Sequence, residues 1–327
     1  MGAVTFAAVR SLSLVLLAMN FASGCSCSGD LEGGGPTPYL RCTQMDPPDA
    51  RDVTMGATRL EVIEREVIIH AALPIRIVLA RGPAGAGEPL LPGLDAIEAH
   101  SPAMVVLLGD LGDGDGTADA SVEALRAALA ELTVPVLLLP GGRDDGELVR
   151  DVLHDAESEH VIDLSGVRSV HIGPLELVPL IGAPEGRYAL SERHCGFGAD
   201  DIEGIAGEIS APSGLRLVLS TSAPATGDPR TAGIDGAEAG DALIAAALLR
   251  VQARGGLYAL PEAFVAQPFD GTTAVSVPTG PIESLHLVVP RMLGPASERA
   301  DGSRQASGVV LLEVSEGGVS VLEVPGG

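Results

Sequence analysis

The sequence contains no lysine and no tryptophan, and its aromatic residues amount to only 2% of the chain. The 20 basic residues, all arginine, face 44 acidic ones, which gives a net charge of −24. This surplus of negative charge argues against a nucleic-acid-binding protein, because phosphates would be repelled. With so few aromatic rings, the core must be aliphatic. The 46% of hydrophobic residues in a chain of 327 can still form a sizeable core.

The apolar run near the N-terminus has the length of a signal peptide and is too short to span a bilayer comfortably. Arg10 precedes SLSLVLLAMNFA, and Ala22-Ser23-Gly24-Cys25 resembles a bacterial lipobox, whose cysteine becomes the acylated first residue. An ordinary signal peptide with a coincidental cysteine is the alternative. We expect residues 1–24 to be a lipoprotein signal peptide, Cys25 the lipid attachment site, and residues 25–55 a flexible tether.

These features predict a protein of the bacterial cell envelope, anchored by lipid to a membrane and facing the periplasm or the surface. Such a compartment permits disulfides. If Cys25 is acylated, three of the four cysteines remain: Cys27, Cys42 and Cys195. We favour a disulfide between Cys42 and Cys195. No C-x-x-C metal-binding spacing is present.

Residues 56–327 alternate between strand-like and helix-like segments and are assigned to one domain. The main expected strands are short apolar runs at 75–80, 105–108, 134–139, 215–220 and 257–260. The main expected helices lie at 118–131 and 237–254. Several short β runs near the C-terminus predict a β-meander. Continuous apolar strands between helices are typical of α/β domains whose sheets are covered on both faces.

Sites in open α/β sheets form where strands end, and four strand-end blocks here have a distinctive form. They are LGDLGD (108–113), VLLLPGGRD (136–144), LVLSTSAP (217–224) and GLYALPEAF (256–264). In order and spacing they resemble the Gly-Asp, Gly-Asn-His-Asp, His-His-x-Pro and Gly-His-x-His blocks of the calcineurin-like metallophosphoesterases. The resemblance covers roughly residues 60–290. It implies an α/β fold, a sandwich of two mixed β-sheets flanked by helices.

The resemblance also implies a two-metal centre, but most of its ligands are replaced. The positions of the family's ligands and catalytic histidine fall on Arg81-Gly82-Pro83, Gly142, Arg143, Thr221-Ser222 and Pro261–Phe264. None of the seven histidines occupies a ligand position. Asp110 remains at the bridging position, and Asp113 and Asp144 remain beside it in the pattern. One bridging carboxylate cannot hold two divalent cations, so we expect no metal and no catalytic residue.

The two arginines at former ligand positions suggest a hypothesis. Arg81 or Arg143 would pair with Asp110 and replace the charge of the metal. The alternative is that both arginines point into water, as exposed loop residues often do. Asp110, Asp113 and Asp115 could also hold a single Ca²⁺, but the EF-hand pattern fails, and we favour a solvated Gly-Asp turn.

Other catalytic arrangements have little support in the sequence. His194 and Cys195 are adjacent, but neighbouring residues usually point apart, so a disulfide or buried thiol is the stronger interpretation. No G-x-S-x-G serine elbow and no phosphate-binding P-loop is present.

The sequence therefore predicts a lipid-anchored pseudoenzyme that acts in binding or envelope interaction, with no cofactor and with no ligand or protein partner that the residues identify. The alternative is an active phosphoesterase with single-metal or non-standard ligation, using Mn, Fe, Zn or Mg. A third possibility is a purely structural envelope protein.

Overall fold

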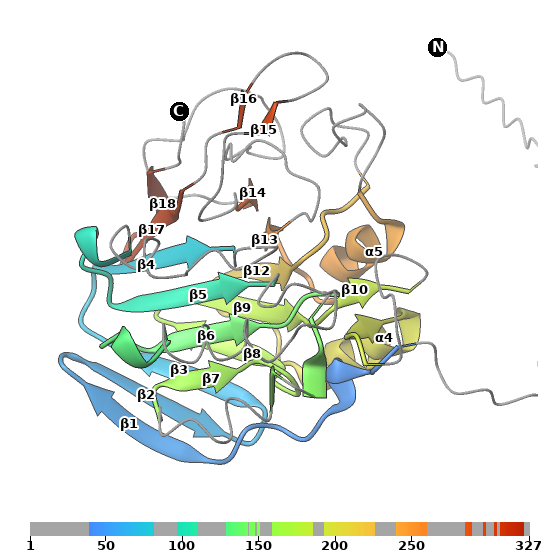
Figure 1. Ribbon diagram of the computed structural model, residues 1–327, viewed down its shortest axis with the longest axis horizontal. Helices are drawn as coiled ribbons and strands as arrows, with labels where there is room; N and C mark the ends of the chain where they lie inside the picture. Colours follow the sequence, from blue (N-terminus) through green and yellow to red (C-terminus); the bar gives the residue numbers. More distant parts are fainter. Residues whose placement is uncertain are drawn as a thin grey trace, which may run out of the picture. The chain divides into compact units, whose positions relative to one another are not determined.

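Two mixed β-sheets form the body of the protein in a computed structural model (Figure 1). The structure describes residues 39–81, 97–109, 129–142, 144–147, 149–150, 159–185, 193–225, 240–259, 285–289, 297–298, 304–305 and 308–323. All of them belong to one structural unit, Thr37–Gly327. The predicted signal peptide and its lipid-bearing Cys25 lie outside the described residues.

The larger sheet has eight strands in the order β1-β2-β3-β8-β9-β12-β13-β14. They are β1 (Arg51–Met55), β2 (Thr58–Ile63), β3 (Glu66–His70), β8 (Ser169–Ile172), β9 (Leu175–Leu180), β12 (Leu215–Ser220), β13 (Gly255–Tyr258) and β14 (Leu285–Val288). Strands β1 to β3 are antiparallel neighbours at one edge, whereas β9, β12, β13 and β14 run parallel.

The smaller sheet has six strands in the order β18-β17-β4-β5-β6-β7. They are β18 (Gly318–Glu323), β17 (Val310–Ser315), β4 (Ile75–Ala80), β5 (Met104–Leu108), β6 (Val136–Leu139) and β7 (Val161–Asp163). Strands β4 to β7 are parallel, so their carboxyl ends meet at one edge of the sheet. Two small pairs complete the strands: β10 (Ala183–Pro184) with β11 (Gly196–Phe197), and β15 (Ser297–Glu298) with β16 (Arg304–Gln305).

The longest described helices are α4 (Ala199–Glu208) and α5 (Ala242–Arg250), and a short 3-10 helix, η1, spans Cys42–Gln44. The expected helix over 237–254 is shorter in the structure because Asp241 caps it, accepting a 2.7 Å hydrogen bond from the Leu243 N–H. Of the expected helix over 118–131, only residues 129–131 are described, and they are helical. No helix in the described part of the chain is long and apolar enough to cross a membrane.

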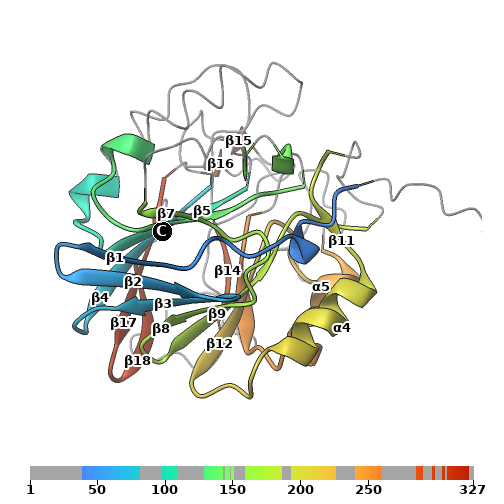
Figure 2. The same ribbon diagram turned by 90° about the horizontal axis from the view of Figure 1, so that it is seen from below.

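Alternation along the strands sorts their side chains into three apolar layers. In β4, Ile77 and Leu79 join the core between the two sheets, while Val78 and Ala80 face the opposite side. The outer face of the larger sheet packs against α4 and α5 through Ile202 and other aliphatic residues. Figure 2 shows these two helices side by side against β9 and β12. This arrangement confirms the predicted α/β fold of two mixed sheets flanked by helices, and it is consistent with a metallophosphoesterase-like sandwich.

The predicted C-terminal meander is wrong. Strand β14 lies next to β13 in the larger sheet, whereas β17 and β18 form a hairpin that adds to β4 in the smaller one. The strands of this segment are thus divided between the two sheets and the separate pair of β15 and β16. Short apolar runs indicate strands but carry no information on which sheet edge each strand extends.

The predicted tether extends too far into the chain. Tyr39 and Cys42 are buried, and Cys42 forms a disulfide with Cys195, the pair favoured from the sequence. Nearby, the buried carboxylate of Asp201 in α4 accepts hydrogen bonds from Thr43 Oγ1 (3.1 Å) and Gln44 Nε2 (2.7 Å). Residues 39–55, which include η1 and β1, therefore belong to the folded domain because they are fixed by a covalent bond, a buried carboxylate and a sheet edge.

Candidate functional site

The strand-end loops that the sequence singled out come from both sheets. Arg81 follows β4, Gly109 follows β5, and Gly141 lies two residues after β6 in the smaller sheet. Thr221 directly follows β12 in the larger sheet. Parallel strands deliver these loops to a common edge of their sheet, as the sequence analysis expected.

Three of these loops touch one another directly. Gly109 has a φ of +61°, and a Cβ placed on it would lie 2.6 Å from Thr221 Cγ2 and 3.3 Å from Gly141 Cα. Glycine suits this position on both counts, since it tolerates positive φ and has no side chain to fit. The ends of β5, β6 and β12 are therefore packed against each other without room for even one more carbon atom at Gly109.

The neighbouring loops are packed in the same way. A Cβ on Gly142 would lie 2.2 Å from the Cβ of Ala183. The hydroxyl of Thr221 donates a 2.8 Å hydrogen bond to the carbonyl of Gly182. The Thr221 side chain thus holds the loop after β12 to the loop after β9.

Asp144 is buried and its carboxylate closes its own turn. Oδ2 of Asp144 accepts a 2.6 Å hydrogen bond from the Gly141 N–H, and the Asp144 N–H donates to the Gly141 carbonyl at 3.2 Å. These two hydrogen bonds join Gly141 and Asp144 across the turn. Asp144 therefore has a structural role in the loop after β6.

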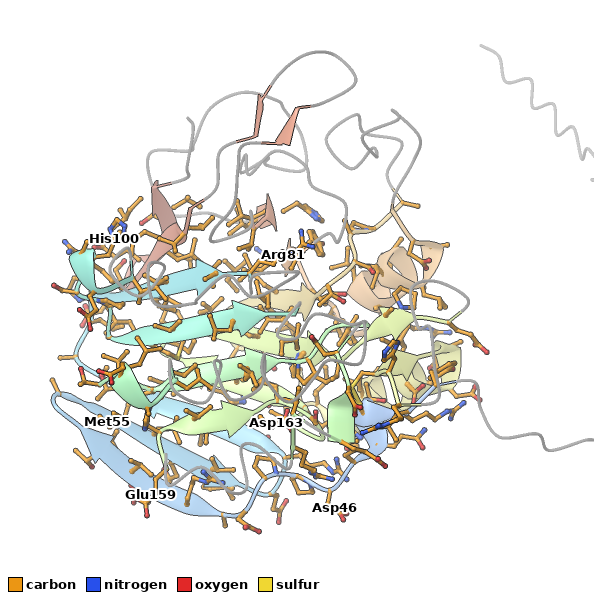
Figure 3. All side chains as sticks on the ribbon, viewed as in Figure 1. Asp46, Met55, Arg81, His100, Glu159 and Asp163 are labelled. Carbon is orange, nitrogen blue, oxygen red and sulfur yellow. A yellow bond between two sulfur atoms is a disulfide. The ribbon has the colours of Figure 1, made fainter. Side chains whose placement is uncertain are left out.

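Arg81 is only 1% exposed and is among the largest fully buried side chains of the described chain (Figure 3). The alternative that this arginine points into water is therefore wrong, because the guanidinium is enclosed by the fold. The hypothesis that Arg81 or Arg143 pairs with Asp110 stays a prediction, since Asp110 and Arg143 lie outside the described residues. Asp113 and Asp115 lie outside them as well.

The donor atoms at the described strand ends do not fit a two-metal centre. Such a centre needs several carboxylates and imidazoles around two cations held roughly 3.5–4 Å apart. Here the positions carry glycine, a buried arginine and the hydroxyls of Thr221 and Ser222. Within the described parts of the chain, no group of three or more His, Cys, Asp or Glu side chains is placed to hold a metal ion.

The segment around His194 and Cys195 has no free thiol, because Cys195 is bonded to Cys42. His194 is 8% exposed, and its burial lowers its pKa. The negative charge of Asp145 raises this pKa by a smaller amount, and the positive charge of Arg193 lowers it by a still smaller one. The disulfide interpretation thus replaces the Cys-His pairing considered from the sequence.

A second group of polar residues was missed by the sequence analysis. Asp163 ends β7 and lines a cavity together with Arg150 and Ser165. Burial raises the pKa of Asp163, because the charged carboxylate loses solvation. Its position at the carboxyl end of a parallel strand was the available signal, but the strand is three residues long and belongs to none of the four family-like blocks.

No model of a known protein family matches the sequence, and no curated protein matches it. One solved crystal structure superimposes with a TM-score of 0.54 at 10% identity, covering 77% of this chain and 99% of that chain. TT1561 of Thermus thermophilus gives 0.46 at 13% identity, over 67% of this chain and 90% of the other. A dimetal phosphatase from Danio rerio gives 0.45 at 14% identity, over 76% and 98%. At these identities, similarity in structure bears on the fold alone.

Proposed function

We propose that this chain is a lipid-anchored, exported protein whose metallophosphoesterase-like domain has lost its two-metal centre and acts in binding or envelope interaction. The proposal combines the two-sheet fold with the residues that stand where the family has ligands. It assigns no catalytic residue.

The observation that carries the proposal is the direct contact among Gly109, Gly141 and Thr221. A two-metal centre needs ligand side chains that surround the cations and leave an open position for water and substrate. Here the backbones after β5 and β6 approach each other, and the methyl group of Thr221 fills the remaining space. Side chains that could act as ligands are absent from these three positions.

The buried Arg81 supports the same conclusion electrostatically. An arginine stays charged at any physiological pH, and burial weakens the screening of its charge by water. A fixed cation at the position of the family's first carboxylate opposes the binding of divalent cations nearby. The substitution therefore removes a ligand and adds repulsion.

Export is supported by the cysteines. The disulfide between Cys42 and Cys195 is of the kind that persists in oxidising compartments. It agrees with the lipobox-like Ala22–Cys25 block, which would leave Cys25 as the acylated first residue. An acyl anchor and a short tether would hold the domain at a membrane surface.

The full chain, expressed in bacteria and extracted from membranes, tests both parts of the proposal. We expect the mass of the mature protein to correspond to a chain that begins at a lipid-bearing Cys25. After incubation with Mn²⁺ and dialysis, we expect far less than one metal per chain and no hydrolysis of p-nitrophenyl phosphate esters.

Metal-dependent turnover that Asp110→Asn abolishes would contradict the loss of the metal centre and favour the single-metal phosphoesterase. Asp200→Asn, an exposed aspartate in the first turn of α4, is the matched control and should not change turnover. Metal-dependent turnover that survives in Asp110→Asn would also contradict the proposal and favour non-standard ligation without Asp110. An unprocessed or unacylated N-terminus would contradict the anchor separately.

A further inference from the structure

A cavity of about 260 Å³ lies beside β7, apart from the packed loops after β5, β6 and β12. One wall is β7 with the turn after it, and the other is the segment that leads into β1. Its polar lining consists of Asp46, Asp49, Arg51, Arg150, Asp163 and Ser165. Figure 3 labels Asp46 and Asp163 on these two walls.

The charged groups of this lining do not pair with one another. Three carboxylates and two guanidinium groups face one cavity, yet within the described chain no ion pair joins either arginine to any of these aspartates. Arg150 Nη2 instead donates to the backbone carbonyl of Asp46 at 2.7 Å. Arg51 donates to two backbone carbonyls at 3.4 and 3.5 Å. Each guanidinium has five N–H donors, so both retain donors for a ligand.

The inner end of the cavity carries the Asp163 carboxylate and the Ser165 hydroxyl. Asp163 Oδ1 accepts a 2.8 Å hydrogen bond from the Ser165 N–H. Ser165 is 1% exposed, and its side chain lies beside the Asp163 carboxylate. Burial raises the pKa of Asp163, although the hydrogen bonds of Ser165 and, to a smaller extent, the charge of Arg150 lower it. A cationic group placed beside Asp163 would compensate this lost solvation.

We propose that this cavity binds a small zwitterion, an α-amino acid or a short peptide, whose ammonium group contacts Asp163 and whose carboxylate contacts Arg51 and Arg150. A ligand that carries both charges satisfies both signs of the lining at once. A carboxylate ligand suits arginine because the planar guanidinium can bind both of its oxygens. The volume suits a small ligand rather than a folded partner.

Isothermal titration calorimetry of the full chain at pH 7 tests the proposal with defined probes. L-alanine and L-alanyl-L-alanine should bind, and the comparison between them distinguishes a free amino acid from a peptide. Ethylamine and acetate, which carry one charge each, should bind at least about tenfold more weakly. Ethylamine or acetate binding as tightly as the zwitterions, or no heat from either zwitterion up to about 10 mM, would overturn the proposal.

Variants locate the binding. Asp163→Asn and Arg150→Gln should each weaken zwitterion binding by about tenfold to a hundredfold, because each removes a charged hydrogen-bond partner. Asp200→Asn and Arg250→Gln change the same residue types on exposed helical positions and should leave the affinity unchanged. If Asp163→Asn does not fold, Arg150→Gln alone decides, and unchanged affinity in it contradicts the assignment.

This binding site is independent of the proposed loss of the metal centre. None of its residues belongs to the packed loops, so zwitterion binding should be the same with and without Mn²⁺. Metal-dependent turnover would contradict the loss of the metal centre but not the proposal for the cavity. Absence of zwitterion binding would contradict the proposal for the cavity but not the loss of the metal centre.

Discussion

Two regions of this molecule lie at the carboxyl ends of strands and have opposite character. After β5, β6 and β12, small uncharged residues let the chain segments touch, as at Gly109, Gly141 and Thr221. Beside β7, charged residues such as Asp163 and Arg150 line an open cavity without pairing. The fold supplies the same kind of edge in both places. The side chains decide whether it closes by packing or stays open to a ligand.

The disulfide between Cys42 and Cys195 lies next to both regions. Beyond Cys42 the chain continues to Asp46 on the cavity wall, and Cys195 packs against Gly182, whose carbonyl accepts the Thr221 hydroxyl. A change here therefore tests whether the two regions depend on a common support.

Loss of this disulfide should give the largest effect on stability. The bond joins residues 153 positions apart, so it greatly restricts the unfolded chain. The double variant Cys42→Ser/Cys195→Ser should lose about 2–5 kcal/mol of unfolding free energy, measured by urea denaturation. Cys27→Ser is the control. Hydrogen exchange should increase in residues 39–50 more than in the loops after β5 and β6. Equal increases in hydrogen exchange in both segments would show that the disulfide stabilises both regions alike.

The packed loops after β5, β6 and β12 form the closed region of this comparison. Adding one carbon atom at Gly109 tests how tightly they pack. Gly109→Ala places a methyl group 2.6 Å from Thr221 Cγ2 at a φ of +61°. Gly56 has nearly the same φ, +58°, but has no atom within 4 Å of its added Cβ. Gly56→Ala therefore measures the conformational cost alone. We expect Gly109→Ala to lose about 1–3 kcal/mol more than Gly56→Ala in urea denaturation, because the clash adds to the strain.

Thr221→Ser provides the second half of this test. Serine removes Cγ2 but keeps the hydroxyl that bonds to the Gly182 carbonyl. In the Gly109→Ala background it should restore part of the lost stability, which double-mutant analysis measures as a coupling energy. If Gly109→Ala and Gly56→Ala cost the same, the strand ends are not closed by packing.

The largely apolar runs of β4, β5, β6 and β12 predicted the strands of an α/β domain, and the resemblance to the metallophosphoesterases implied the sandwich of two sheets. The loops were identified from blocks that resemble those of the family, such as the Gly-Asp pair that follows β5. The direct contact of Thr221 with Gly109 could not be predicted from the sequence. The two residues are separated by 111 others, and local patterns do not determine the distance between them.

Other features were hidden for different reasons. The exposure of Arg81 was left open because an arginine after a strand is usually solvated, and only the surrounding chain shows that it is buried. The cavity beside β7 is formed by segments more than 100 residues apart, Asp46 to Arg51 and Val161 to Ser165. Its aspartates and arginines are common surface residues, so their composition carries no signal until the fold brings them together.

The segment around His194 connects the two regions through its backbone. The carbonyl of His194 accepts a 2.8 Å hydrogen bond from the Leu40 N–H, and the residue forms a β-bridge with Asp145, which follows the turn of the closed region. Burial lowers the pKa of His194 below its ordinary value of 6.5, with Asp145 acting in the opposite direction. The neutral imidazole is therefore the form that suits the folded state.

This shift predicts a small loss of stability in mild acid. As the pH falls below 6.5, the unfolded chain binds a proton at His194 before the folded chain does, so the unfolding free energy falls until the pH passes the lowered pKa. In His194→Gln this contribution disappears, and the fall in unfolding free energy between about pH 7.5 and pH 5 should be smaller than in the unaltered protein. His70→Gln, at an exposed position in β3, is the matched control. Equal pH dependence in His194→Gln and the unaltered protein would mean that protonation of this histidine does not change the unfolding free energy. The link between the two regions would then not depend on its charge.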